Sequence, residues 1–251
     1  MITTIERSLK DRIDLALANL ICAQPDGDRM RIALPVLYPS GSGSAVEVMI
    51  NGDKCFVSDF GFGQLEAEMH GADDFYNDSA KKAAERFSVS FDGSNVFAIW
   101  ASMAKLESAI AAVANASVQA ATLSIMKALE EKEKQVNNEL FEKIKIIFGA
   151  KSVARNQEII GRDSTWKAHN VVSLSNEKRA IFEFVGEHQN SIANKFMMFS
   201  DLSKVENGYS LNSVVRNTTS MREKKAMLAD VSNVLEFNAG SEEFLRYAKA
   251  A

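Results

Sequence analysis

The segment RMRIALPVLYPSGSGSAVEVMINGDKCFVSDF, residues 29–60, decides the fold of the N-terminal part of the chain. Its apolar residues alternate with polar ones at the two-residue period of half-buried strands. The Gly- and Ser-rich stretch 39–44 predicts one turn, and Asn51-Gly52 predicts a tight hairpin because both residue types tolerate a positive φ. The three predicted strands span residues 29–38, 45–50 and 54–60. The segment therefore predicts an antiparallel β-meander.

Further elements flank this meander. In residues 3–23, apolar side chains recur every three or four positions, which predicts an amphipathic helix. Its apolar stripe consists of Ile5, Leu9, Ile13, Leu17 and Leu20. Beyond the meander, we predict short helices at 64–71 and 79–87, and a two-stranded hairpin at 88–101 that turns at Asp92-Gly93.

Residues 102–148 contain neither Pro nor Gly and are rich in Ala, the best helix former. This composition predicts a long helical region with a break near residues 132–138. The Ala-rich part, 103–129, can pack closely against another helix, either within the chain or in a homodimer. We favour packing within the chain and keep the homodimer as the alternative.

After Gly149 the pattern is mixed. Strand-like runs lie at 167–175, 180–185, 194–202 and 233–238, and helical patterns lie at 220–231 and 241–250. The whole chain is predicted to be α+β, with an N-terminal β-meander, flanking helices, a long helical connector and a C-terminal α/β domain. The predicted parts are an acidic α+β domain at 1–101, the Ala-rich connector at 102–148 and a mixed α/β domain at 149–251.

The charge of the chain is mildly negative and uneven. The net charge is −4, with 9 Lys and Arg against 15 Asp and Glu in residues 1–100, and 16 against 14 in residues 137–251. Non-specific nucleic-acid binding relies on clustered Lys and Arg. The densest such cluster, residues 221–228, has the pattern of the solvated face of a helix. We therefore do not favour nucleic acid as the partner.

Cysteine content and hydropathy predict the compartment. Cys22 and Cys55 are the only cysteines, too few for a disulfide framework or a zinc knuckle. The chain has no run of about 18 apolar residues, and its start lacks the pattern of a secretory signal. These features predict a protein of the reducing cytoplasm with no membrane segment.

The tripeptide Asp59-Phe60-Gly61 matches the magnesium-binding tripeptide of protein kinases. A kinase also needs a Gly-rich phosphate loop and a His-Arg-Asp catalytic loop, and this chain has neither. We therefore predict a structural role. Gly61 and Gly63 permit a sharp exit from the strand, and Asp59 caps the turn or the start of the next helix.

The same segment carries a family resemblance. Residues 26–71 are similar to the domain-of-unknown-function family 1828, whose members show an Asp-Gly-Asp, then strands leading to a Ser-Asp-x-Gly turn, then a short helix. The matching residues here are Asp26, Gly27, Asp28, Ser58, Asp59, Gly61 and Leu65. The resemblance covers roughly residues 5–125, and the segment after it resembles the partner family 1829 in order and strand pattern. It implies a protein of bacteria or their mobile elements, with a role in host–phage conflict, but no reaction.

A restriction-endonuclease-like fold is the alternative for the C-terminal domain. That fold places an acid on one strand and a Glu-x-Lys on the next, where they bind magnesium and orient the attacking water. Glu183 occupies the Glu position, but Val185 stands in place of the Lys. The preceding strand offers His169 and Asn170, and Asp163 lies outside it. If the fold is of this type, its site is degenerate.

Glu183 lies between Ile181 and Val185 on one face of its predicted strand. A carboxylate in such a position is costly unless it is paired or bound to metal. We predict a structural pair with a neighbouring base, for which the candidates are Lys167, His169 and Lys195.

Residues 73–78, DDFYND, combine three acids with two aromatic residues, a pattern that fits either a basic partner or a solvated loop.

Because the chain has no complete catalytic set, we predict a non-enzymatic interaction, inhibitor or regulatory protein, of the anti-defence or defence-accessory kind. The alternative is a nucleic-acid-binding or magnesium-dependent nuclease activity in the C-terminal domain. We expect no cofactor and no metal, because the three histidines lack zinc-ligand spacing. The candidate binding residues are Asp59, Asp73, Asp74, Asp78 and Glu183.

Overall fold

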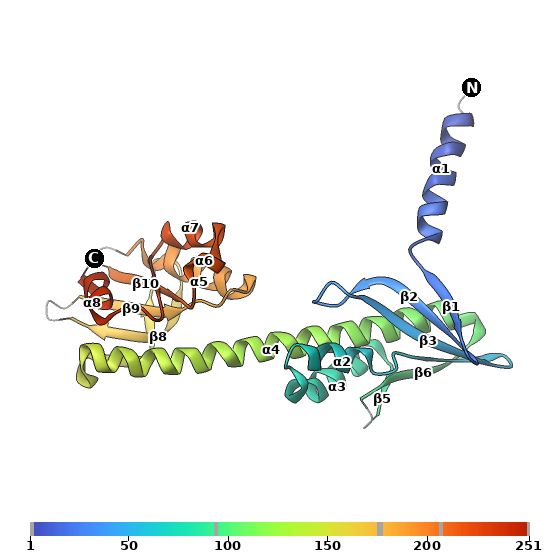
Figure 1. Cartoon of the computed structure of the whole chain (residues 1–251), viewed down its shortest axis with the longest axis horizontal. Coiled ribbons are helices and arrows are strands. Elements are labelled where there is room, and N and C mark those ends of the chain that lie inside the picture. The colour runs from blue at the N-terminus through green and yellow to red at the C-terminus, as the bar shows by residue number, and fades with distance from the viewer. Residues whose placement is uncertain (1–2, 93–94, 175–177, 206–207, 250–251) are drawn as a thin grey trace. The chain divides into compact units, whose positions relative to one another are not determined.

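The computed structural model describes residues 3–92, 95–174, 178–205 and 208–249 (Figure 1). It divides into two compact units, Met1–Glu130 and Glu131–Ala251, here called unit 1 and unit 2. Helix α4 (Leu106–Phe148) begins in unit 1 and ends in unit 2. Both units combine helices with a sheet, so the predicted α+β class is confirmed.

Unit 1 contains a six-stranded sheet in the order β1-β2-β3-β4-β6-β5, in which all neighbouring strands are antiparallel. Its strands are β1 (Cys22–Asp26), β2 (Arg29–Leu37), β3 (Gly43–Asn51), β4 (Lys54–Ser58), β5 (Ser90–Phe91) and β6 (Phe97–Ser102). The predicted meander corresponds to β2, β3 and β4 and is confirmed. Gly52, with a φ of 61°, forms the predicted hairpin turn between β3 and β4.

Apart from α1 (Thr3–Ala18), whose described residues are exposed, the α-helices of unit 1 pack on one face of this sheet, which we call the inner face. The helical elements are α1 (Thr3–Ala18), α2 (Phe62–Met69), η1 (Asp73–Phe75), α3 (Tyr76–Phe87), η2 (Met103–Lys105) and the first part of α4. Ala116 and Ala120 of α4 lie in one core with Val46, Val57 and Phe97 of the sheet. Small side chains let the helix approach closely, so the intramolecular packing that the sequence favours is confirmed.

Unit 2 contains a five-stranded mixed sheet in the order β11-β10-β9-β8-β7. β8 pairs antiparallel with both β7 and β9, whereas β10 runs parallel to both β9 and β11. The elements are η3 (Ala150–Ser152), β7 (Val153–Ile160), β8 (Thr165–Ser173), β9 (Arg179–Phe184), α5 (Gln189–Leu202), β10 (Tyr209–Val215), α6 (Thr218–Met221), α7 (Glu223–Ala229), β11 (Asn233–Glu236) and α8 (Ser241–Lys249).

Helices cover both faces of this second sheet. The second part of α4 and α8 pack on one face, where Leu140 and Phe244 meet Phe182 of β9. On the other face, Phe199 of α5 lies in a core with Ile181 of β9. Alternate residues of β9 therefore point to opposite layers, as expected for a central strand.

Several expectations about element bounds are wrong. The first helix ends at Ala18 rather than at residue 23, because residues 22–26 form an edge strand that turns at Gly27, with a φ of 64°. Helix α4 has no break at 132–138. Residues 194–202 form part of helix α5 rather than a strand. Their buried side chains and that of Ile192 recur at helical spacing. The expected turn at Asp92-Gly93 extends outside the described residues.

Among the described residues, the segment Met103–Phe148, which contains α4, is the one helical segment long and apolar enough to cross a membrane. One side of its Ala-rich part lies in the core of unit 1, and 44% of its apolar window is buried. The cytoplasmic location stays a prediction.

Candidate functional site

The Asp-Phe-Gly tripeptide forms a buried anchor. Asp59 is 0% exposed and accepts hydrogen bonds from the backbone N–H groups of Gly61, Gly63 and Phe97, at 3.2, 3.4 and 2.8 Å, and from the Ser117 hydroxyl at 2.6 Å. These contacts join the turn to β6 and to α4. Gly61 has a φ of 80°, as its predicted role requires. Burial raises the pKa of Asp59 above its ordinary value. The capping role is confirmed.

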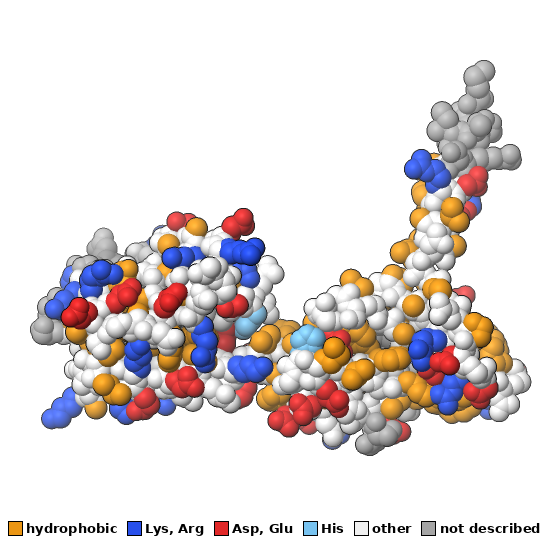
Figure 2. Space-filling view, in the orientation of Figure 1, with side chains coloured by type: hydrophobic (Ala, Val, Ile, Leu, Met, Phe, Trp, Pro, Cys, Tyr) orange, Lys and Arg blue, Asp and Glu red, His pale blue; other side chains and the backbone are white. Residues whose placement is uncertain are grey.

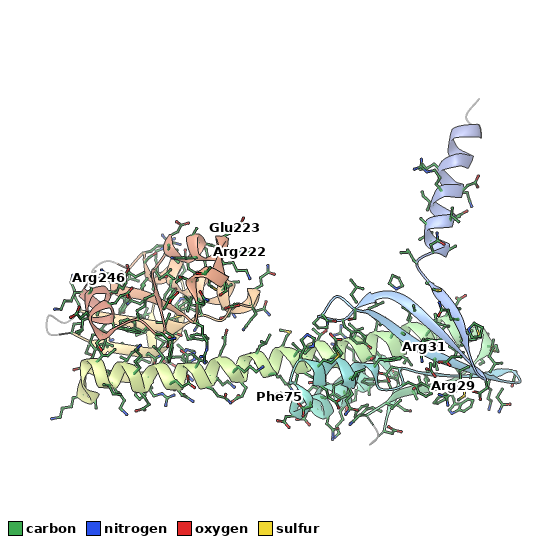
Figure 3. The ribbon with its side chains drawn as sticks, viewed as in Figure 1. Arg29, Arg31, Phe75, Arg222, Glu223 and Arg246 are labelled. Carbon is green, nitrogen blue, oxygen red and sulfur yellow. The ribbon has the colours of Figure 1, made fainter. Side chains whose placement is uncertain are left out.

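Two arginines of β2, Arg29 and Arg31, labelled in Figure 3, contact both segments that carry the family resemblance. The Arg31 guanidinium lies 2.9 Å from Asp26 and 3.0 Å from Glu47, and the Arg29 guanidinium lies 3.1 Å from Glu47. The Arg29 guanidinium also stacks on the Phe60 ring, 4.3 Å from its centroid. Sequence reasoning missed this cluster, although alternate positions of one strand share a face.

An acidic surface lies on the α2–α3 part of unit 1, where Figure 2 shows acidic side chains gathered over α3. Asp73, Asp74 and Asp78 are exposed, and within the described part of the chain none of their side chains has an ion pair or hydrogen bond. On neighbouring α2, the side chains of Leu65 and Met69 are 51% and 74% exposed. We call these five residues the acidic surface. It combines acidic side chains that form no ion pair with exposed apolar side chains.

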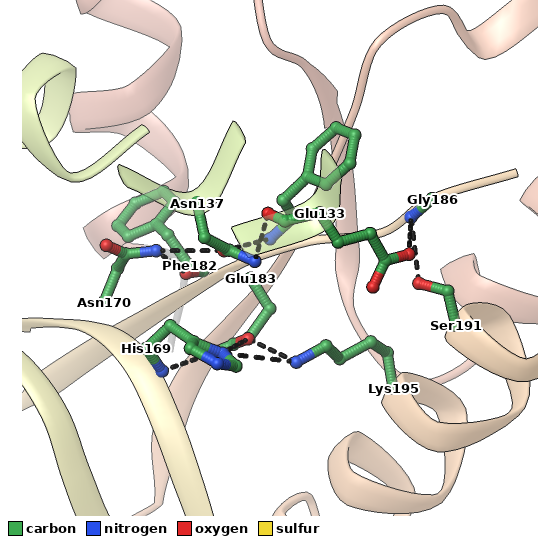
Figure 4. Close-up of polar contacts among 10 residues, drawn as sticks. Glu133, Asn137, His169, Asn170, Phe182, Glu183, Gly186, Ser191 and Lys195 are labelled. Atoms are coloured by element: carbon green, nitrogen blue, oxygen red, sulfur yellow. Dashed lines mark hydrogen bonds and ion pairs between the residues drawn. The ribbon is translucent and has the colours of Figure 1, made fainter. Parts of the chain in front are cut away.

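In unit 2, Glu183 lies at the centre of a charged cluster (Figure 4). Its side chain is 0% exposed, and one carboxylate oxygen accepts the backbone N–H of His169. The other oxygen lies 2.7 Å from the Nδ1 of His169 and 2.5 Å from the Nζ of Lys195. The predicted structural pairing of Glu183 is thus confirmed for His169 and Lys195. Lys195 reaches it from helix α5 rather than from a strand.

A second set of polar contacts ties α4 to the end of β9. A carboxylate oxygen of Glu133 accepts the Gly186 N–H at 3.1 Å and lies 2.8 Å from the His188 Nε2. The side-chain oxygen of Asn137 accepts the Phe184 N–H at 3.2 Å. A Cβ at Gly186 would meet the Glu133 carboxylate at 2.2 Å, so this side chain would have to move away from the Gly186 N–H. These side chains fix the helix to the sheet.

The Glu183 cluster does not have the form of a magnesium site. Burial alone would raise the pKa of the Glu183 carboxyl, but Lys195 and His169 beside it lower that pKa to about 2. Both carboxylate oxygens therefore already have partners. Val185, at the position of the missing Lys, is buried in an apolar cluster with Ile192. Within the described ranges, no group of three or more His, Cys, Asp or Glu residues could hold a metal ion.

The five candidate binding residues do not form one site. Asp73, Asp74 and Asp78 lie close together in the sequence, on η1 and the first turn of α3, and are exposed. Asp59 is buried in unit 1, and Glu183 is buried in unit 2. Of the five, the three exposed acids are therefore the ones that a partner can reach.

Comparisons with protein-family models, curated proteins and solved structures found no match to this chain. The resemblance to families 1828 and 1829 thus stays a prediction.

Proposed function

We propose that this chain is a non-enzymatic protein-binding protein, and that the acidic surface of unit 1 binds a basic, partly apolar segment of a partner protein. The observation that carries the proposal is the presence of three exposed acids without side-chain ion pairs on η1 and α3, together with exposed Leu65 and Met69 on the preceding helix α2. Protein interfaces commonly combine an apolar centre with a polar rim.

Charge supports a basic partner. Residues 1–130 contain 11 Lys and Arg against 17 Asp and Glu, a net charge of −6, whereas residues 131–251 contain 18 against 16. The local charge of the acidic surface thus agrees with the charge of its whole unit. Complementary charge mainly speeds encounter and sets the register of binding, so the affinity should fall as salt rises.

The buried acids support a non-enzymatic function. Asp59 and Glu183 already have hydrogen-bond partners for both of their carboxylate oxygens. A general base or a metal ligand needs an oxygen that can reach a substrate or an ion. Neither carboxylate offers one unless the contacts that hold it break. An inhibitor or regulatory role in host–phage conflict, which the resemblance implies, is part of the same proposal.

The test uses a fluorescent helical peptide with leucines on one face and lysines on the other, and a matched peptide with glutamates in place of the lysines. We expect the full chain to bind the basic peptide in a salt-sensitive manner and to ignore the acidic one. Replacing Asp73, Asp74 and Asp78 together by Asn should weaken binding about tenfold or more.

The matched control replaces three exposed acids of unit 2, Glu139, Glu142 and Glu158, by Gln. This variant changes the net charge of the chain equally and should bind the basic peptide like the wild type. If both variants bind the basic peptide equally weakly, the net charge of the chain alone explains the effect. That result would contradict the proposal that the acidic surface is the binding site. Magnesium-dependent cleavage of DNA by the wild type, lost in Glu183→Gln without unfolding, would replace the proposal with a nuclease.

A further inference from the structure

Helix α1 carries an apolar stripe that no other described residue of the chain covers. Leu9, Ile13 and Leu17 are 58%, 49% and 56% exposed, and Leu20 just beyond the helix is 51% exposed. The helical spacing places Leu9, Ile13 and Leu17 on one face of α1. A helix of this length is only marginally stable in water without packing. Packing of the stripe against another surface would therefore stabilise the helix.

The sheet of the same unit has a second face, which we call the outer face, and no helix among the described residues packs on it. Met49, Phe56 and Trp100 lie opposite one another on β3, β4 and β6 and form a cross-strand row on this face. The rings of Phe56 and Trp100 are 5.0 Å apart, and Trp100 is 58% exposed. The inner face, in contrast, is covered by α2, α3 and α4. A sheet face of this kind is normally buried against another layer.

We propose that α1 of one copy packs its apolar stripe on the outer face of a second copy, and that the second copy returns the same contact. This exchange gives a two-fold symmetric dimer that contains two identical helix-on-sheet contacts. It gives both the helix stripe and the sheet face the layer that each lacks within one chain.

Charge favours a second copy as the occupant of the outer face. Residues 3–18 contain three acids and three bases, so α1 is neutral within a unit of net charge −6. The outer face carries Arg29 and Arg31 around Glu47, so its charges are also of both signs. A neutral helix can approach a second acidic unit without the repulsion that its other surfaces would meet. The Ala-rich face of α4 is already buried in its own unit.

The test is the mass of the full chain in solution, measured by sedimentation at micromolar concentration. We expect a dimer for the wild type and a monomer for Ile13→Asp and for Trp100→Ala. Both side chains are exposed in a single copy, so circular dichroism should show an unchanged fold. Leu15→Asp is the matched control, because Leu15 is 65% exposed on the opposite side of α1. This variant should remain dimeric.

A mixing experiment separates the exchange from other assemblies. Ile13→Asp loses the helix stripe but keeps the sheet face, and Trp100→Ala loses the sheet face but keeps the helix. Equal amounts of the two monomeric variants should form a mixed dimer through one intact contact, weaker than the wild type. A monomeric wild type would overturn the proposal. A dimer that survives Trp100→Ala would also overturn it, because α1 would then have another partner.

Discussion

Replacing Lys195 by Met removes the cation that neutralises a fully buried carboxylate. In the wild type, the Lys195 ammonium lies 2.5 Å from Glu183, which is 0% exposed. In the variant, His169 remains as a partner, but the permanent positive charge is gone. Removing one member of a buried pair costs about 3–5 kcal/mol because the other member is left as an uncompensated charge.

The pKa of Glu183 gives an independent magnitude. The pKa falls from an ordinary 4.5 to about 2 in the folded chain. Each pH unit between the two values is worth about 1.4 kcal/mol, so the environment of the folded chain stabilises the carboxylate by about 3 kcal/mol. His169 contributes to this lowering of the pKa together with Lys195. Because the folded pKa is lowered, this stability is present above about pH 4.5 and is lost as the pH falls toward 2.

The assay follows unit 2 alone. The chain has two Trp residues, and in a Trp100→Phe background the emission of Trp166 on β8 reports the unfolding of unit 2 in urea. We expect Lys195→Met to lower the free energy of unfolding by about 3–5 kcal/mol at pH 7. The double variant Glu183→Met/Lys195→Met should lose less, because no buried charge remains.

Additive losses in the double variant would refute this reasoning, since they would show that the two side chains do not interact. A loss below about 1 kcal/mol in Lys195→Met would refute it as well, because exposed ion pairs have that magnitude. Glu183→Gln should cost less than Lys195→Met and should flatten the stability profile between pH 4.5 and pH 2.

Three further outcomes follow from the geometry. Gly61→Val should destabilise unit 1 by about 1–3 kcal/mol in thermal unfolding, because a β-branched residue is strained at a φ of 80°. Asp59→Asn should lower the stability of unit 1 by about 1–3 kcal/mol while binding of the basic peptide in the folded chain stays unchanged, because Asp59 serves as an anchor. Asp201→Ala should increase quenching of Trp166 by acrylamide, because the carboxylate accepts the indole N–H of Trp166 at 2.7 Å and the N–H groups of two residues in the β7–β8 turn.

Local sequence patterns predicted much of unit 1. Alternating apolar residues and the Asn51-Gly52 turn are local signals, and the β2–β3–β4 meander follows from them. The role of Asp59 was also predictable, because a sharp turn after a strand leaves backbone N–H groups that need an acceptor. The contact between Asp59 and Ser117 was not, since it joins residues 58 positions apart.

Unit 2 was harder to predict because its elements depend on tertiary contacts. The run Phe196-Met197-Met198-Phe199 resembles a strand, and only the buried positions Ile192, Met198 and Phe199 reveal a helix. The pairing of Glu183 was predictable from the cost of burying a carboxylate. The choice of Lys195 as its partner was not predictable, because it depends on how α5 packs against β9. Local sequence patterns do not specify such a tertiary contact.

The acidic surface is the central claim, and hydrogen exchange of the full chain with and without the basic peptide tests it most directly. We expect slower exchange of backbone amides in residues 62–87, which contain α2, η1 and α3, and no change there in the variant with Asn at 73, 74 and 78. Protection confined to residues 153–202 of unit 2, or equal protection in the variant, would contradict the account.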